Sequence, residues 1–118
     1  MSSQSEQLRD RTKAFALRIV KLFRALPRAV EAQVIGKQLL RSGTSVAANY
    51  RAACRARSKA EFIAKIGIVL EEVDESVLWI EMLIDAAILK KERVDPLLNE
   101  ARQLTAIFTA SRQTAKQK

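Results

Sequence analysis

Apolar side chains recur at alternating steps of three and four residues in four separate stretches of this chain. Such spacing places them on one face of an α-helix, whereas a half-buried strand would show them at every second residue. The first stretch has this spacing at Leu8, Thr12, Phe15, Ile19, Leu22 and Leu26. Four amphipathic helices with short connections and no strand pattern predict an all-α protein, an antiparallel up-and-down four-helix bundle.

Signals that start and stop helices separate these stretches. Pro27 ends the first helix, because proline disfavours a helical conformation in the residue before it. Ser58 followed by Glu61 is a capping box that starts the third helix, and Asp95–Pro96 offers a start for the fourth. The predicted helices span about residues 5–26, 29–56, 59–91 and 95–111 of a single domain, residues 1–118, with a frayed tail at 112–118.

Small side chains line the inner face of the second predicted helix. Gly43 costs roughly 1 kcal/mol relative to alanine in a helix interior, so we expect a neighbouring helix to approach closely there. Asn49 falls in the apolar row of the same helix. A polar side chain at such a position needs a hydrogen-bond partner and can fix helix register or oligomeric state.

The residue types that most enzymes and metal sites use are scarce. The chain has no histidine and one cysteine, Cys54, so an intrachain disulfide and a zinc site built on cysteine pairs are excluded. The hydroxyls and carboxylates that remain have no imidazole to activate them. The three glycines lie singly inside predicted helices, so they form no glycine-rich phosphate loop. We therefore expect no enzyme, no cofactor and no metal.

Neither a signal peptide nor a membrane span is predicted. The first ten residues lack the apolar core of a signal peptide, and no apolar run approaches about 18 residues. We therefore expect a cytoplasmic protein without a membrane partner.

The net charge of +8, from 21 basic and 13 acidic side chains, favours a polyanionic partner such as RNA or DNA. Basic residues in the first two predicted helices return to the same helix side. The predicted nucleic-acid contacts are Arg11, Arg18, Lys21, Arg28, Lys37, Arg41, Arg51 and Arg55. The alternative is an ordinary solvated face with ion pairs inside the chain to Glu71, Asp74, Glu81 and Asp85.

The third predicted helix is acidic in an otherwise basic chain, with eight acidic and four basic side chains in residues 58–92. Acidic and basic helices of different copies could meet and close a ring, although neighbouring helices of one bundle can satisfy the same charges. The predicted oligomer interface comprises Asn49, Tyr50, Glu71, Glu72, Asp74, Glu75, Trp79 and Glu81. Trp79 and Tyr50 could also stack on unpaired bases, but both lie beside apolar rows, which favours packing.

A set of residues in the middle of the chain resembles a known family. They are Gln38–Ser42, Ser45–Arg51, Ser58, Phe62, Lys65, Glu72, Glu75, Ser76 and Trp79. The chain looks like the 23S ribosomal RNA intervening-sequence family of four-helix bundle proteins, which are similar to accessory proteins of diversity-generating retroelements. The resemblance covers nearly the whole chain. Ala52 departs from the pattern, which has glutamate there, so a polar link expected beside Arg51 cannot form.

The resemblance implies an up-and-down bundle that assembles as a ring, typically a homopentamer, without a cofactor. For the retroelement relatives it also implies binding to a reverse transcriptase and to nucleic acid. Our leading interpretation is a non-enzymatic homo-oligomeric bundle that binds RNA or DNA through its basic rows, as an accessory to a reverse transcriptase or an RNA-associated process. The alternative is a protein–protein interaction scaffold whose charge asymmetry serves ring assembly only.

Overall fold

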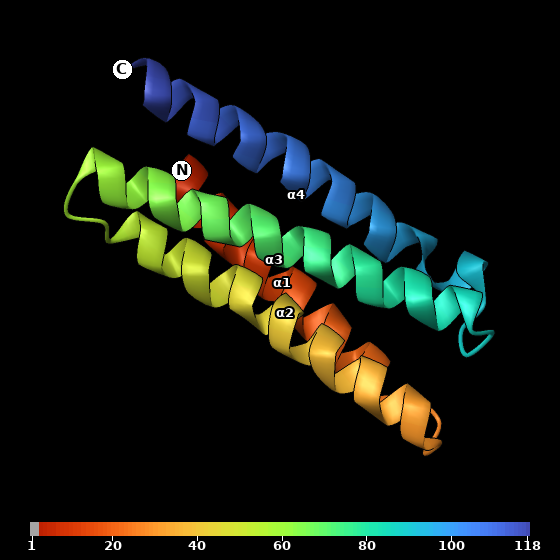
Figure 1. The fold of residues 1–118 in the computed structure, drawn as a ribbon. Coiled ribbons are helices and arrows are strands. Elements are labelled where there is room, and N and C mark those ends of the chain that lie inside the picture. The colour runs from red at the N-terminus through yellow and green to blue at the C-terminus, as the bar shows by residue number, and fades with distance from the viewer. Residues whose placement is uncertain (1–2) are drawn as a thin grey trace.

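The computed structural model describes residues 3–118 as four helices joined by short turns (Figure 1). These are α1 (Gln4–Arg24), α2 (Val30–Cys54), α3 (Lys59–Asp85) and α4 (Lys91–Gln117). α2 packs against α1 and α3, while α4 packs against α3 and, over a shorter stretch, against α1. Successive helices run in opposite directions, and residues 3–118 contain no strand. The fold is therefore the predicted antiparallel up-and-down four-helix bundle.

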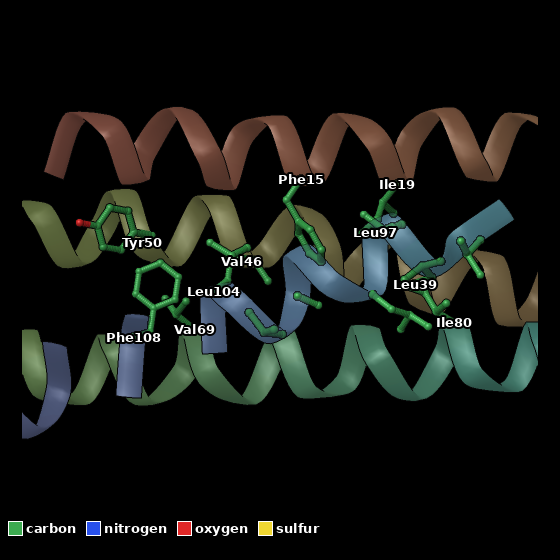
Figure 2. Packing of buried hydrophobic residues seen from close by; sticks show 14 of the residues in the cluster. Phe15, Ile19, Leu39, Val46, Tyr50, Val69, Ile80, Leu97, Leu104 and Phe108 are labelled. Carbon is green, nitrogen blue, oxygen red and sulfur yellow. The ribbon is translucent and has the colours of Figure 1, made fainter. Parts of the chain in front are cut away.

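The core runs along the bundle axis, where every helix contributes fully buried side chains (Figure 2). In Figure 2, Phe15 and Ile19 point from α1 into this core. Tyr50 of α2 lies against Phe108 of α4, with ring centroids 5.0 Å apart and ring planes inclined by 41°. The apolar faces that the three-and-four spacing predicted are thus the faces that the helices bury.

Two small residues of α2 allow its neighbours to approach closely. A Cβ atom on Gly43 would collide with the Ile19 side chain of α1, which confirms the close contact expected at this glycine. On the side toward α3, the hydroxyls of Ser42 and Ser76 lie 2.8 Å apart, and both residues are fully buried. Each hydroxyl also lies within hydrogen-bond distance of a carbonyl of its own helix. Because a hydroxyl carries a single proton, one serine donates to the other, and the second donates to its own helix carbonyl, so both hydroxyls have partners within the core.

Serine caps start two of the helices. Ser3 accepts a hydrogen bond from the backbone N–H of Glu6 at the start of α1. Ser58 accepts one from the N–H of Glu61, and the Glu61 carboxylate accepts the N–H of Arg57 at 3.1 Å. The structure thus confirms the helix start predicted after Ser58. The predicted ends of the first two helices agree with the structure to within two residues.

The third helix ends at Asp85, six residues before the predicted end at 91. Ala87 has a φ of 59°, in the left-handed region, and its N–H donates to the carbonyl of Ile84. The N–H of Ile88 donates to the carbonyl of Leu83, which completes a Schellman motif. Glycine normally occupies the left-handed position of this motif, and alanine there costs roughly 1 kcal/mol. Because the chain has no glycine in this region, the sequence offered no sign of the turn.

The fourth helix begins at Lys91, so the predicted start at Asp95–Pro96 is wrong. Pro96 lies inside α4, where its ring nitrogen cannot donate to the carbonyl of Glu92. Glu92 is exposed, so water can satisfy that carbonyl. Val94 and Leu97 are 2% and 5% exposed, and their burial holds the extra turn against the bundle.

The C-terminal segment predicted to fray continues α4 to Gln117. Arg112 explains this extension, because its Nε donates to the carbonyl of Ile63 in α3 at 3.2 Å. The guanidinium lies over Gly67, where a Cβ atom would stand 3.4 Å from Nε. An arginine of α4 therefore lies on the backbone of α3, at a distance that would put a Cβ atom on Gly67 in ordinary van der Waals contact with it.

Candidate nucleic-acid interface

Two of the arginines predicted to contact phosphates form ion pairs inside the bundle. Arg11 of α1 contacts Glu100 of α4, with 2.6 Å between Nη2 and Oε1 and 3.2 Å between Nε and Oε2. The hydrogen bond to this carboxylate raises the pKa of Arg11. The pair joins the first helix, α1, to the last, α4, so the charge of Arg11 is compensated within the bundle.

Arg41 is the second of these arginines and links α2 to α3. Its guanidinium donates to Glu72 at 3.1 Å and to Glu75, whose Oε1 also accepts the indole N–H of Trp79 at 3.3 Å. The hydrogen bond from Arg41 is the main reason that the pKa of Glu75 is lowered. The sequence suggested four other acidic partners in α3, but those side chains are exposed, whereas Glu72 and Glu75 are half-buried toward α2.

Six other cations surround two hollows that share Ala48 and Arg51. The first hollow, of 430 Å³, lies between α1 and α2, and the second, of 540 Å³, lies beside the α2–α3 turn. We call the following residues the basic surface: Arg9, Lys13, Arg51, Arg55, Arg57 and Lys65. The ion pairs among residues 3–118 involve none of them.

The local sequence explains why this surface is both hollow and positive. Ala47, Ala48 and Ala52 line it from α2, and their short side chains leave the helix open to a ligand. Arg51 lies in the last turn of α2, where the helix dipole favours a positive charge. Glu61 is the one acidic side chain that lines this surface, against six cations. The positive charge of the surface is therefore largely uncompensated.

The remaining predicted phosphate contacts lie elsewhere. Arg18 and Lys21 line a separate groove between α1 and α4, together with Arg93. Arg28 is exposed in the α1–α2 turn, and Lys37 is exposed on α2. Only Arg51 and Arg55 of the predicted set belong to the basic surface.

Four members of the basic surface were missed by the sequence analysis. They are Arg9, Lys13, Arg57 and Lys65. The predicted rows run along single helices, whereas the surface combines α1, α2, a turn and α3. The four-residue step from Arg9 to Lys13 was a usable signal for a shared helix face.

The predicted interface residues fall into three environments. Tyr50 is 5% exposed and belongs to the core, where burial raises the pKa of its hydroxyl, so its ring is not available to a base. Asn49 is half-buried and donates to the carbonyl of Ser45 in its own helix, at 2.9 Å. Trp79 is half-buried and bonded to Glu75. The exposed members are Glu71, Asp74 and Glu81 of α3.

The described residues 3–118 contain no group of three or more side chains that could hold a metal ion. No helix in this part of the chain is long and apolar enough to cross a membrane. The fold and the charged surface thus define a class: helical bundle proteins whose candidate site is a cluster of cations around shallow hollows.

The comparisons with known proteins identify the family. Residues 5–110 match the model of the 23S rRNA-intervening sequence protein family, and the chain belongs to that family. A crystal structure from Bacteroides thetaiotaomicron, described as a protein with unknown function from the S23 ribosomal protein family, is similar to the whole bundle. It is 33% identical, with a TM-score of 0.87 over 94% of this chain and 99% of that chain. Neither description names an enzymatic activity, and no curated protein matches.

Proposed function

We propose that this protein is a non-enzymatic helical bundle that binds the phosphate backbone of nucleic acid through the basic surface. The observation that carries the proposal is the cluster of six cations around two adjoining hollows, with no ion pair to any of them among residues 3–118. Cations that are not neutralised by the protein can displace the counterions condensed on a nucleic acid. The basic surface is therefore matched to a polyanion.

The composition of the surface supports phosphate rather than base recognition. Four of its six cations are arginines, whose planar guanidinium groups can donate two hydrogen bonds to one phosphate. None of the residues that line the two hollows is aromatic, so the surface offers no platform on which a base could stack. The family description names an rRNA sequence, which makes RNA the first polyanion to test.

Charge reversal at Arg51, which both hollows share, tests the proposal most directly. We expect Arg51→Glu to weaken binding to a short RNA duplex about tenfold or more, because it removes one phosphate contact and adds a repulsive charge. Fluorescence anisotropy with a labelled duplex measures the affinity, and circular dichroism checks that helicity is unchanged.

Arg102→Glu is the matched control, because Arg102 is exposed on α4 and lines neither hollow. The same change in net charge there should have a much smaller effect. Equal losses in the two variants, or no binding by the unmodified protein, would contradict the proposal.

The outer ridge of α3 favours a second candidate function, self-association. Its exposed side chains are Ile68, Glu71, Asp74, Leu78, Glu81, Met82 and Asp85. A ridge that combines acidic and large apolar side chains is complementary to the basic surface of another copy. Such a contact between different patches closes into a ring when the rotation permits, and a pentamer is one such ring.

Removing the charges of this ridge should dissociate the assembly. We expect the combined change Glu71→Gln, Asp74→Asn, Glu81→Gln and Asp85→Asn to lower the mass from light scattering to the 13.2 kDa of one chain. Affinity for the RNA duplex should not fall in this variant, since the basic surface is intact. A mass that does not change, or an unmodified protein that is already monomeric, would rule out this candidate.

A further inference from the structure

The line of contact between α1 and α4, here called the seam, carries different pairs of charges along its length. Near one end Arg11 of α1 pairs with Glu100 of α4. Seven residues further along α1 stands Arg18, and seven residues back along the antiparallel α4 stands Arg93. Both line one groove of 260 Å³. The contact between the two helices therefore pairs a cation with an anion at Arg11 and Glu100, but brings two cations together at Arg18 and Arg93.

The electrostatics of this groove are unbalanced. Lys21 adds a third positive charge, and none of the lining residues is acidic. The ion pairs among residues 3–118 do not involve Arg18, Lys21 or Arg93. Like charges that face each other across a seam repel, and an anion placed between them converts the repulsion into attraction. The groove therefore favours an anionic group from outside the bundle.

The floor of the groove is apolar. It consists of Leu22, which is half-buried, and of Val94 and Leu97, which belong to the core. A cavity of about 150 Å³ is sufficient for a benzene-sized group, so a hollow of 260 Å³ can receive one or two apolar side chains. A phosphate group is charged and does not pack on an apolar floor, whereas a protein segment with alternating acidic and apolar groups matches both parts of the groove.

The shape of the seam suits a helix. α1 and α4 approach each other over the shortest stretch of any neighbouring pair. The residues that line the groove come from the second half of α1 and the first two turns of α4. A groove between two helices is a site into which a third helix can place an apolar row.

We propose that this groove docks an acidic amphipathic helix of a partner protein. Carboxylates of the partner helix would bridge Arg18 and Arg93, and an apolar side chain of the same helix would cover Leu22 between them. The site differs from the basic surface, because it lies on the side of α1 toward α4, whereas the basic surface involves the side toward α2. The proposal is therefore independent of nucleic-acid binding.

Arg93→Glu tests the proposal without weakening the fold. A glutamate at this position should pair with Arg18 as Glu100 pairs with Arg11, so the melting temperature should rise, by about 2 °C. The probe is a labelled synthetic peptide of four helical turns, with leucines at three-and-four spacing and glutamates at the flanking positions. We expect the unmodified protein to bind it and Arg93→Glu to weaken binding at least about tenfold, which corresponds to one repulsive contact in place of an attractive one.

Three comparisons decide the outcome. A peptide of the same composition with its leucine spacing scrambled should bind at least about tenfold more weakly, since it cannot use the apolar floor. Arg102→Glu should bind the ordered peptide like the unmodified protein. The proposal is overturned if the ordered peptide does not bind, if the scrambled peptide binds equally, or if Arg93→Glu leaves its affinity unchanged. It is also overturned if Arg93→Glu weakens RNA binding while Arg51→Glu does not, because the groove would then belong to phosphates.

Discussion

Replacing Phe108 with alanine should lower the free energy of unfolding by about 3–5 kcal/mol. The Phe108 side chain is fully buried, and its ring packs on Tyr50 at 5.0 Å between centroids. Truncation removes that contact, leaves a cavity in the core and deprives Tyr50 of its aromatic neighbour. Domains are stable by only about 5–15 kcal/mol, so this one change should remove a large fraction of the stability.

Urea unfolding followed by far-ultraviolet circular dichroism measures this effect through the midpoint and the slope. Leu17→Ala is the matched control, because Leu17 is 55% exposed and its truncation opens no cavity. We expect the control to stay within about 0.5 kcal/mol of the unmodified protein. Equal midpoints for the two variants would mean that Phe108 is not at the centre of a packed core.

Affinity for an RNA duplex should fall about 10³-fold between about 50 mM and about 200 mM salt. This magnitude follows if all six cations of the basic surface contact phosphates, because each contact releases condensed counterions. The logarithm of the association constant should then fall against the logarithm of the salt concentration with a slope of about −5. A titration series at several salt concentrations gives the slope directly.

The slope also separates the basic surface from the other cations. In Arg51→Glu it should become shallower by about one, whereas Arg102→Glu should leave it unchanged. An affinity that does not depend on salt would show that phosphates are not the partner. A slope much steeper than the value for six contacts would show that cations outside the basic surface take part.

Much of the fold follows from the sequence, because apolar spacing and caps are local signals. The buried positions Phe15 and Ile19 and the cap at Ser58 are of this kind. The errors lie where distant contacts decide the local structure. Burial of Val94 extends α4 past its proline, and Arg112 of α4 rests on Gly67 of α3. Neither contact can be read from neighbouring residues in the chain.

The candidate site could be predicted only in part, because its residues come from several helices. Of the arginines in the rows predicted along single helices, Arg51 and Arg55 lie in the basic surface. The same reasoning included Arg11 and Arg41, although their partners lie 89 and between 31 and 34 residues away in the sequence. Which arginines are neutralised depends on how the helices face each other, and that is a property of the packed bundle.

The buried hydroxyl pair of Ser42 and Ser76 has a consequence for the basic surface. If α2 slid along α3 by one helical turn, the two hydroxyls would separate and the hydrogen bond between the helices would be lost, at a cost of about 0.5–1.5 kcal/mol, because each hydroxyl could then bond only a carbonyl of its own helix. The serine pair therefore opposes sliding of α2 along α3. It fixes the position of Lys65 of α3 relative to Arg51 of α2 along the bundle axis, so a ligand would meet cations whose spacing is already set.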